Sequence, residues 1–365
     1  MKKIFGAILL LTSCMPHSPS SQADGEGGAY TPVPFKYAKL LKVERNDSMI
    51  IADIRNPWSA DTTAVLHHYE VSRPFGKVLV YTSVHCGLLK ELGAIGSISG
   101  VGDAEYIHIP EIKKDLKDGT VQDCGGSAEP NIEAIINLSP DAIMLSPFEN
   151  AGSYGKLGKL GIPIVECADY MENVPLGRAE WVRFYGMLMG REEEADSLFA
   201  QVEKEYLRLK SLQKSDTLPT VVTEMKIGNI WYVAAGDSYV GNMIKDAGGR
   251  YIFSDVAGAG ALPYSPETVF DRSQQADIWV FKYSQQTDIT LDELAKEWPN
   301  NKRMKAWQTG NTFGCNLMRN GFYEETPFHP EVLLQDFIAI MHPDIINRES
   351  LRYYKRLNNN KNVSQ

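Results

Sequence analysis

The sequence lacks several features that mark whole classes of protein. No apolar run approaches the ~20 residues that a membrane-spanning helix needs. No dense basic stripe is present, and 37 Lys and Arg stand against 46 Asp and Glu, for a net charge of -9. With 43% hydrophobic residues the composition is that of an ordinary globular protein, which excludes disorder. We therefore expect a globular body that binds no nucleic acid.

Signatures of common enzyme sites are missing as well. The chain has no G-x-x-x-x-G-K-[ST], no G-x-S-x-G and no H-E-x-x-H, so it lacks a phosphate loop, a nucleophile elbow and a zinc-protease helix. Gly100-Val101-Gly102 lacks the third glycine of a dinucleotide-binding loop. We expect a protein that is not an enzyme, and an enzyme remains the main alternative from another class.

Cysteine is scarce, with five in the chain. None forms a CxxC pair or lies at ligand spacing from a histidine, so we predict no zinc site and no other resident metal or cofactor. Cys86, Cys124, Cys167 and Cys315 allow three full disulfide pairings, and the sequence does not choose among them.

The N-terminus reads as a secretion signal. Met1-Lys2-Lys3 is basic, residues 4–11 are apolar, and Leu11-Thr12-Ser13-Cys14 resembles the bacterial lipobox, in which the cysteine is lipidated. Residues 1–14 are thus predicted to be a lipoprotein signal peptide ending at Cys14, and residues 15–36 a flexible linker. This predicts an extra-cytoplasmic protein held at a bacterial membrane by its lipid; inner-membrane, outer-membrane and surface anchoring stay open.

Strand and helix patterns alternate along most of the chain. Residues 142–145, 162–166, 220–225 and 278–281 have the composition of buried strands, and helical patterns lie between them. The alternation predicts an α/β fold of two lobes with mainly parallel sheets flanked by helices. We place the N-terminal lobe at 37–176, including a hairpin before residue 59, the C-terminal lobe at 214–347, and a polar tail at 348–365.

One long helix is predicted between the lobes, at 177–213. Apolar residues recur there at three- and four-residue spacing, from Trp181 and Phe184 to Tyr206 and Leu209, as on an amphipathic helix. A bend at Gly190 is left open. Residues 192–212 would span about 30 Å if straight, enough to bridge two lobes.

Several segments, in this order along the chain, resemble the periplasmic substrate-binding proteins of ABC importers for ferric siderophores, haem and cobalamin. They are residues 88–94, 98–102, 130–145, 160–165, 175–181, 246–249 and 265–281, and the span from His329-Pro330 to His342-Pro343. The resemblance implies two lobes that face each other across a cleft and are joined by one rigid helix. It also implies a partner, the dimeric ABC permease.

The same resemblance implies a docking role for one glutamate on each lobe. Glu133 and Glu267 match these positions, and each would pair with arginines of the permease, since Arg binds carboxylate bidentately. The alternative is that both are acids near a helix N-terminus, where the helix dipole favours them.

The ligand should lie at loops that follow the carboxyl ends of the strands. Aromatic side chains gather in these loops and could stack on a large planar ligand. The predicted ligand-binding residues are Ser83, His85, Tyr106, Phe148, Trp231, Tyr232, Tyr239, Tyr264, Arg319 and Tyr323. For the aromatic residues core packing is the alternative, and His85 is also explained by a structural role.

The sequence therefore predicts a monomeric, lipid-anchored protein that captures an iron chelate, either a ferric siderophore or haem, and delivers it to a permease. Arg319 is the only arginine assigned to the cleft loops, so a strongly anionic catecholate is not favoured. Cobalamin is an alternative ligand, and a surface cargo-binding lipoprotein without a permease is an alternative function.

Overall fold

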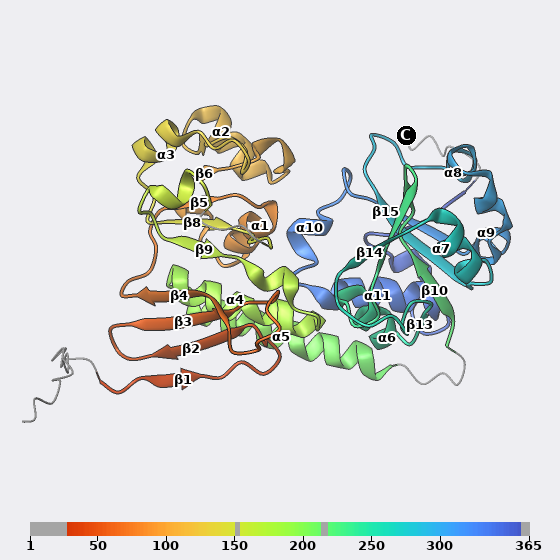
Figure 1. The fold of residues 1–365 in the computed structure, drawn as a ribbon, viewed down its shortest axis with the longest axis horizontal. Helices are drawn as coiled ribbons and strands as arrows, with labels where there is room; N and C mark the ends of the chain where they lie inside the picture. Colours follow the sequence, from red (N-terminus) through yellow and green to blue (C-terminus); the bar gives the residue numbers. More distant parts are fainter. Residues whose placement is uncertain (1–27, 150–153, 213–217, 359–365) are drawn as a thin grey trace, which may run out of the picture.

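The computed structural model describes residues 28–149, 154–212 and 218–358. Figure 1 shows two α/β lobes side by side, with a separate antiparallel sheet beside the first lobe. The predicted fold class is confirmed, because each lobe contains a five-stranded sheet made mainly of parallel strands and flanked by helices. The predicted signal peptide, Cys14 and residues 15–27 of the linker lie outside the described residues.

The N-terminal lobe is built on a parallel sheet of order β7-β6-β5-β8-β9. Its strands are β5 (Val78–Val80), β6 (Ile98–Val101), β7 (Gln122–Asp123), β8 (Ala142–Leu145) and β9 (Ile164–Glu166), and its helices are α1 (Ser83–Glu91), α2 (Pro110–Asp118) and α3 (Ile132–Leu138). Short 3-10 turns lie at Ile95–Ser97, Ala104–Tyr106, Leu157–Lys159 and Ala168–Met171. All residues of β5 and β8 are apolar and buried. This composition is expected for the strands of a parallel sheet that helices cover on both faces.

The C-terminal lobe repeats this plan with sheet order β13-β10-β15-β16-β17, in which only the β17 edge is antiparallel. The sheet contains β10 (Thr220–Thr223), β13 (Arg250–Tyr251), β15 (Ile278–Tyr283), β16 (Thr312–Asn316) and β17 (Lys355–Arg356). A second sheet contains β11 (Lys226–Ile227), β12 (Ile230–Ala234) and β14 (Ala261–Tyr264). The helices are α6 (Tyr239–Asp246), α7 (Pro266–Ser273), α8 (Leu291–Glu297), α9 (Lys305–Gln308), α10 (Phe322–Glu325) and α11 (Pro330–Met341), with 3-10 turns at Pro299–Arg303 and Arg348–Ser350.

The predicted N-terminal hairpin is the centre of a four-stranded antiparallel sheet. Its strands are β1 (Thr31–Val33), β2 (Leu41–Arg45), β3 (Ile50–Arg55) and β4 (Val65–Val71). The linker prediction was therefore wrong for residues 31–33, because β1 pairs with β2. We call residues 28–76 the N-terminal appendage. It is fixed to the first lobe by Glu180, whose buried carboxylate accepts hydrogen bonds from the backbone N–H groups of residues 36–38.

The connection between the lobes is two helices where one was predicted. Gly190 ends α4 (Pro175–Met189) with φ of 64°, a left-handed conformation that favours glycine. The next helix, α5 (Glu192–Ser211), folds back along α4. Nε of Arg183 on α4 therefore lies 2.7 Å from Oδ1 of Asp196 on α5. Figure 1 shows α5 running from the first lobe to the second. The bridging function predicted for residues 192–212 thus belongs to α5 alone.

The predicted polar tail was wrong for residues 348–358, which complete the second lobe. Tyr353 and Tyr354 are buried, and the carboxylate of Asp336 accepts hydrogen bonds from the backbone N–H groups of residues 352–354. β17 then adds an edge strand to the sheet. Burial of the two tyrosines explains why a segment of polar composition folds against the lobe.

Each of the four cysteines outside the predicted signal peptide is buried and free. Cys86, Cys124, Cys167 and Cys315 form no disulfide with one another. None of the three possible pairings therefore occurs, and these thiols pack as small apolar side chains.

Candidate functional site: a cavity between the lobes

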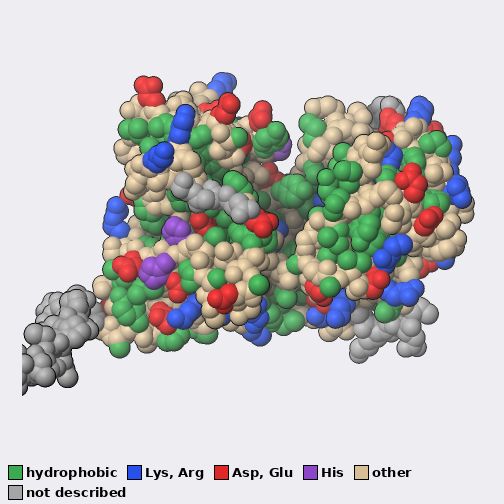
Figure 2. All heavy atoms as spheres, viewed as in Figure 1, with side chains coloured by type: hydrophobic (Ala, Val, Ile, Leu, Met, Phe, Trp, Pro, Cys, Tyr) green, Lys and Arg blue, Asp and Glu red, His purple; other side chains and the backbone are tan. Residues whose placement is uncertain are grey.

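The space-filling view shows a hollow between the two lobes (Figure 2). A cavity of about 490 Å³ lies there, within the range of small-molecule sites. Tyr170 and Arg178 line it on the side of the first lobe, and residues of both C-terminal sheets and several helices line the other side. The second lobe's lining residues include Thr223, Glu224, Tyr239, Val240, Met243, Ala261, Val280, Lys282, Phe322, Tyr323, Thr326, Leu333, Phe337 and Tyr354.

Arg178 supplies one positive charge to this cavity. It lies in the first turn of α4, and its Nε donates a hydrogen bond to Oδ2 of Asp169 at 3.0 Å. Its guanidinium lies 5.8 Å from the centre of the Tyr239 ring, within cation–π distance. Asp169 is fully buried, and burial opposes its charge, but His85 and Arg178 together lower the pKa of this carboxyl. The buried carboxylate of Asp169 thus holds Arg178 in place near the N-terminus of α4.

Lys282 supplies a second positive charge from the other lobe. It follows the buried part of β15, and its Nζ forms an ion pair with Glu224, the residue after β10. Burial opposes the charge on Lys282, but the carboxylate of Glu224 outweighs it, so the pKa of Lys282 is raised. Both residues lie at the carboxyl ends of neighbouring parallel strands, where ligand sites of α/β sheets occur.

The first lobe has a further cavity at the carboxyl ends of its own strands. This cavity of about 850 Å³ is lined by Tyr81 and Thr82 after β5, by Ser146 after β8, and by Phe148 and Lys156. Among the described residues that line it, Lys156 is the one cation. The lobe therefore presents a hollowed polar and aromatic surface on the edge that carries its strand ends.

The structure places three predicted ligand-binding residues in these cavities. Tyr239 and Tyr323 line the cavity between the lobes, and Phe148 lines the cavity on the first lobe. Tyr323 is 46% exposed and its ring meets Phe322 edge to face, so it has a free face for a ligand. These three positions remain predicted contacts.

Two predicted contacts were wrong because their side chains are buried in the core. His85 is 2% exposed, with its Nε2 2.9 Å from Oδ1 of Asp169 and 3.2 Å from the hydroxyl of Tyr185. Burial opposes protonation of His85, but Cys167 and Asp169 raise its pKa to about 10. Trp231 is 0% exposed, donates its Nε1–H to the carbonyl of Thr223 and packs on Trp279.

The other predicted contacts lie outside the linings described above. They are Ser83 in the first turn of α1, Tyr106, Tyr232 and Arg319 on exposed surface, and Tyr264, which stacks on Phe253. Tyr264 is held by this packing at a ring distance of 5.7 Å.

Sequence reasoning missed both cations of the cavity. Arg178 lies in a segment of the family resemblance, but its helical context gave no sign that it faces the cleft. Lys282 directly follows a predicted strand, and this position at a carboxyl end is the signal that could have identified it. Tyr170, which donates a hydrogen bond to the carbonyl of Pro147 at 2.5 Å, had no such signal.

The lobes also meet at a second junction beside the cavity. α1 of the first lobe packs against α10 of the second, and a Cβ on Gly87 would come within 2.6 Å of the carbonyl oxygen of Glu324. His329 lies between two carboxylates there, 2.9 Å from Glu91 of the first lobe and 2.8 Å from Glu331. The lobes are thus closed on each other on the side that carries Phe322 and Tyr323.

Two properties of the described residues bear on membrane and metal binding. No described helix has both the length and the apolar character needed to cross a membrane. No group of three or more His, Cys, Asp and Glu within residues 28–149, 154–212 and 218–358 is arranged to hold a metal ion.

Comparison with known proteins identifies the family. The periplasmic binding protein family model matches residues 78–316. An uncharacterised lipoprotein of Methanocaldococcus jannaschii is 28% identical over 304 residues, covering 80% of this chain and 72% of the relative. The name of this relative as a lipoprotein agrees with the predicted lipid anchor, and that name gives no ligand.

Solved structures share the fold. A possible iron-binding periplasmic solute-binding protein of Staphylococcus epidermidis superposes with a TM-score of 0.57 at 21% identity, covering 73% of this chain and 99% of that chain. A haem complex of a Staphylococcus aureus protein superposes with a TM-score of 0.54 at 16% identity, covering 73% and 98%. The matching family and these neighbours are binding proteins and not enzymes. The chain belongs to the periplasmic binding protein family.

Proposed function

We propose that this protein is the substrate-binding component of an ABC importer and that it captures an iron chelate, a ferric siderophore or haem, in the cavity between its lobes. The observation that carries the proposal is the pairing of two cations with aromatic walls in one inter-lobe cavity. Arg178 and Lys282 provide hydrogen-bond donors and positive charge for acceptor oxygens or carboxylates of the chelate. Tyr170, Tyr239 and Tyr323 provide ring surface for its apolar body.

The relatives support this ligand class. The names of the neighbours from the two Staphylococcus species refer to iron and haem. The shared fold supports a cavity between two lobes, and the lining residues would decide the ligand. No bond is made or broken in this function, so affinity and release are its only chemistry.

Delivery would use the anchor and the two matched glutamates. Glu133 in the first turn of α3 and Glu267 in the first turn of α7 are exposed. Neither forms an ion pair with another described residue, which leaves both carboxylates available for arginines of a permease. Lipidation of Cys14 would hold the protein near that permease.

Ligand capture is tested by titration of the full-length protein in detergent. Haem, ferrichrome and cyanocobalamin are added in turn, and quenching of tryptophan fluorescence is followed. We expect saturable binding of haem or ferrichrome, with an affinity that falls in the Tyr239→Ala variant and is unchanged in Tyr106→Ala. Failure of all three compounds to bind would overturn the metal-chelate proposal, and binding of cyanocobalamin alone would assign the site to a corrinoid.

Delivery is tested separately by charge reversal. The Glu133→Lys, Glu267→Lys double variant should bind ligand with nearly unchanged affinity and fail to support uptake in the native host. Normal uptake by this variant would remove the docking role, and it would favour a surface cargo-binding lipoprotein that uses no permease.

A further inference from the structure

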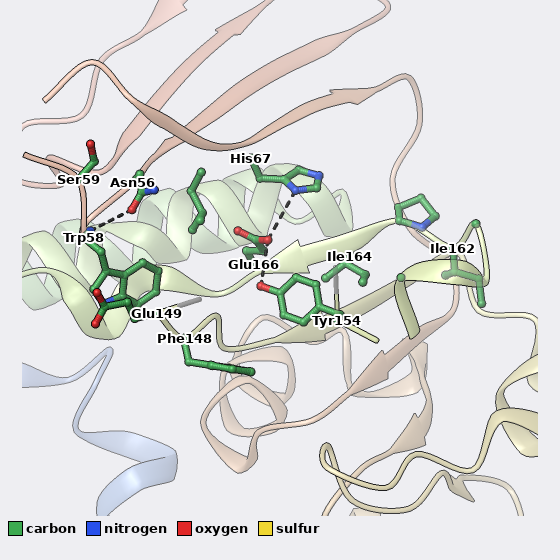
Figure 3. A pocket seen from close by; sticks show the side chains of 14 residues that line it. Asn56, Trp58, Ser59, His67, Phe148, Glu149, Tyr154, Ile162, Ile164 and Glu166 are labelled. Carbon is green, nitrogen blue, oxygen red and sulfur yellow. Dashed lines mark hydrogen bonds and ion pairs between the residues drawn. The ribbon is translucent and has the colours of Figure 1, made fainter. Parts of the chain in front are cut away.

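A cavity distinct from the inter-lobe cavity lies between the N-terminal appendage and the segments around strand β9 of the first lobe. It measures about 740 Å³ and is lined by residues of the loop after β3, of β4 and of the segments around β9. Figure 3 shows its side chains. Trp58 and His67 precede residue 78, where the match to the family begins, so this cavity is formed partly by a region that the family model does not include.

Glu166 is the buried acid of this cavity. Its side chain lies between His67 and Tyr154 (Figure 3), and the residue is 4% exposed. Its Oε1 accepts a hydrogen bond from the Tyr154 hydroxyl at 2.9 Å and lies 3.6 Å from Nδ1 of His67. Its Oε2 is buried without a hydrogen-bond partner among the described residues. A buried carboxylate oxygen without a donor is costly, and a ligand that brings a donor would remove that cost.

Aromatic side chains form the walls around this acid. Trp58, Phe148 and Tyr154 all line the cavity, and Phe148 is 61% exposed. Trp58 is held in place because Oδ1 of Asn56 accepts a hydrogen bond from its backbone N–H at 3.0 Å. Tyr154 has φ of 52°, an unfavourable conformation for a tyrosine that directs its hydroxyl to Glu166. The rings are therefore positioned before any ligand arrives.

Acidic groups outnumber basic ones in this lining. Glu149 and Glu166 are its acids, His67 is its titratable base, and no Lys or Arg is among the described residues that line it. Aromatic faces attract cations, and two carboxylates add Coulombic attraction in a partly dry site. An anion would meet two carboxylates there and no Lys or Arg among the described lining residues. The aromatic walls thus suit an apolar body, and the rings together with the carboxylates favour a positively charged head group.

We propose that this cavity is a second ligand site, for a small organic cation with a protonated amine or quaternary ammonium head and an apolar body. The head would donate to, or lie against, Glu166, and the body would pack on Trp58 and Phe148. The site is independent of the cavity between the lobes, because Glu166, Trp58 and His67 do not line that cavity.

The test is isothermal titration of the full-length protein in detergent with 2-phenylethylamine, and with 2-phenylethanol as its uncharged counterpart. We expect saturable binding of the amine and at least about tenfold weaker binding of the alcohol, since the charged contact is lost. Glu166→Gln and Trp58→Ala should each weaken amine binding by about tenfold as well. The control Arg319→Gln, which changes an exposed residue outside both cavity linings, should leave it unchanged.

Glu149→Gln keeps the test decisive if Glu166→Gln fails to fold, because Glu149 is exposed and its loss carries little folding cost. Absence of saturable amine binding would overturn the proposal. So would equal binding of amine and alcohol, or amine binding that Glu149→Gln and Trp58→Ala both leave intact.

Discussion

Two of the molecule's cavities have aromatic walls but differ in their charged side chains. The inter-lobe cavity has two cations and one acid, Glu224, whereas the cavity under the appendage has two acids and no Lys or Arg among its described lining residues. The cavity between the lobes combines Tyr170, Tyr239 and Tyr323 with Arg178 and Lys282. The cavity under the appendage combines Trp58, Phe148 and Tyr154 with Glu149 and Glu166. Ring surface alone therefore does not decide which ligand enters, because it serves both sites equally. The charged side chains at the strand ends make the selection.

The cavities also differ in what holds their walls together. The inter-lobe cavity needs both lobes, and part of its wall comes from Phe322 and Tyr323 of α10, which packs on α1. The appendage cavity is built within the first lobe and the sheet beside it. Motion of the lobes should therefore change the first cavity and leave the second unchanged.

The largest effect is expected from removing the Lys282–Glu224 ion pair of the inter-lobe cavity. The double variant Lys282→Met, Glu224→Gln removes both charges, so no lone charge is left buried. Affinity for the anionic probe haem should fall by about a hundredfold, the change that a lost charged hydrogen bond of ~2.7 kcal/mol produces. The measurement is the fluorescence titration, and amine binding in the appendage cavity should be unaffected.

The matched control for this variant is Arg319→Gln, which removes an exposed arginine outside the cavity. It should leave haem affinity unchanged. If the control and the double variant behaved alike, the Lys282 ammonium would not contribute to haem binding.

A smaller effect is expected from separating the lobes at their second junction. In Gly87→Ala the new Cβ would lie 2.6 Å from the backbone oxygen of Glu324, so α1 and α10 must move apart at a cost of about 1–3 kcal/mol. We expect about tenfold weaker haem binding and unchanged amine binding, because only the first cavity spans both lobes. Small-angle X-ray scattering should show a larger radius of gyration.

Gly96→Ala is the control for that variant. A Cβ at Gly96 would meet no atom within 4 Å, so its haem affinity and scattering profile should match those of the unchanged protein. An equal loss of both ligands in Gly87→Ala would show instead that the whole first lobe is disturbed.

The smallest effect concerns His329, the ionic link across the same junction. Burial opposes its charge, but the carboxylates of Glu331 and Glu91 raise its pKa to about 10. Because the pKa in the folded state is above the unfolded value, the stabilisation is complete below about pH 6.5 and is lost as the pH rises through about 10. His329→Gln should lower the free energy of unfolding by about 1 kcal/mol at pH 6, given its partial exposure.

Urea denaturation of both proteins at pH 6, 8 and 10 measures this effect. The difference in unfolding free energy should shrink toward pH 10, where the histidine of the unchanged protein loses its proton. A difference that is constant with pH would mean that His329 acts by packing and not by its charge.

Local patterns predicted the elements of this fold well. The strand expected at residues 142–145 is β8, and the one expected at 278–281 is β15 with two residues added. Helix α6 lies between the strands expected at residues 220–225 and 278–281, as the predicted alternation requires. Buried parallel strands are apolar throughout, so their composition alone reveals them. The same logic missed β1 and β17, because short edge strands carry little apolar signal and depend on their partners.

The site was less predictable because its groups meet from distant parts of the chain. His85 and Asp169 are 84 residues apart, and their contact in the core removes His85 from the cleft. Trp231 lies on a predicted cleft loop, yet the alternation of β12 points it inward to Trp279. Which face a strand residue occupies depends on the register with its neighbours, and sequence spacing does not fix that register.

The most direct test of the account is to locate the iron. Crystals of the protein grown with haem should give an anomalous iron signal in the cavity between the lobes, beside Arg178 and Lys282. Iron bound on the outer surface, or in the cavity beneath the appendage, would contradict the assignment of the inter-lobe cavity as the capture site.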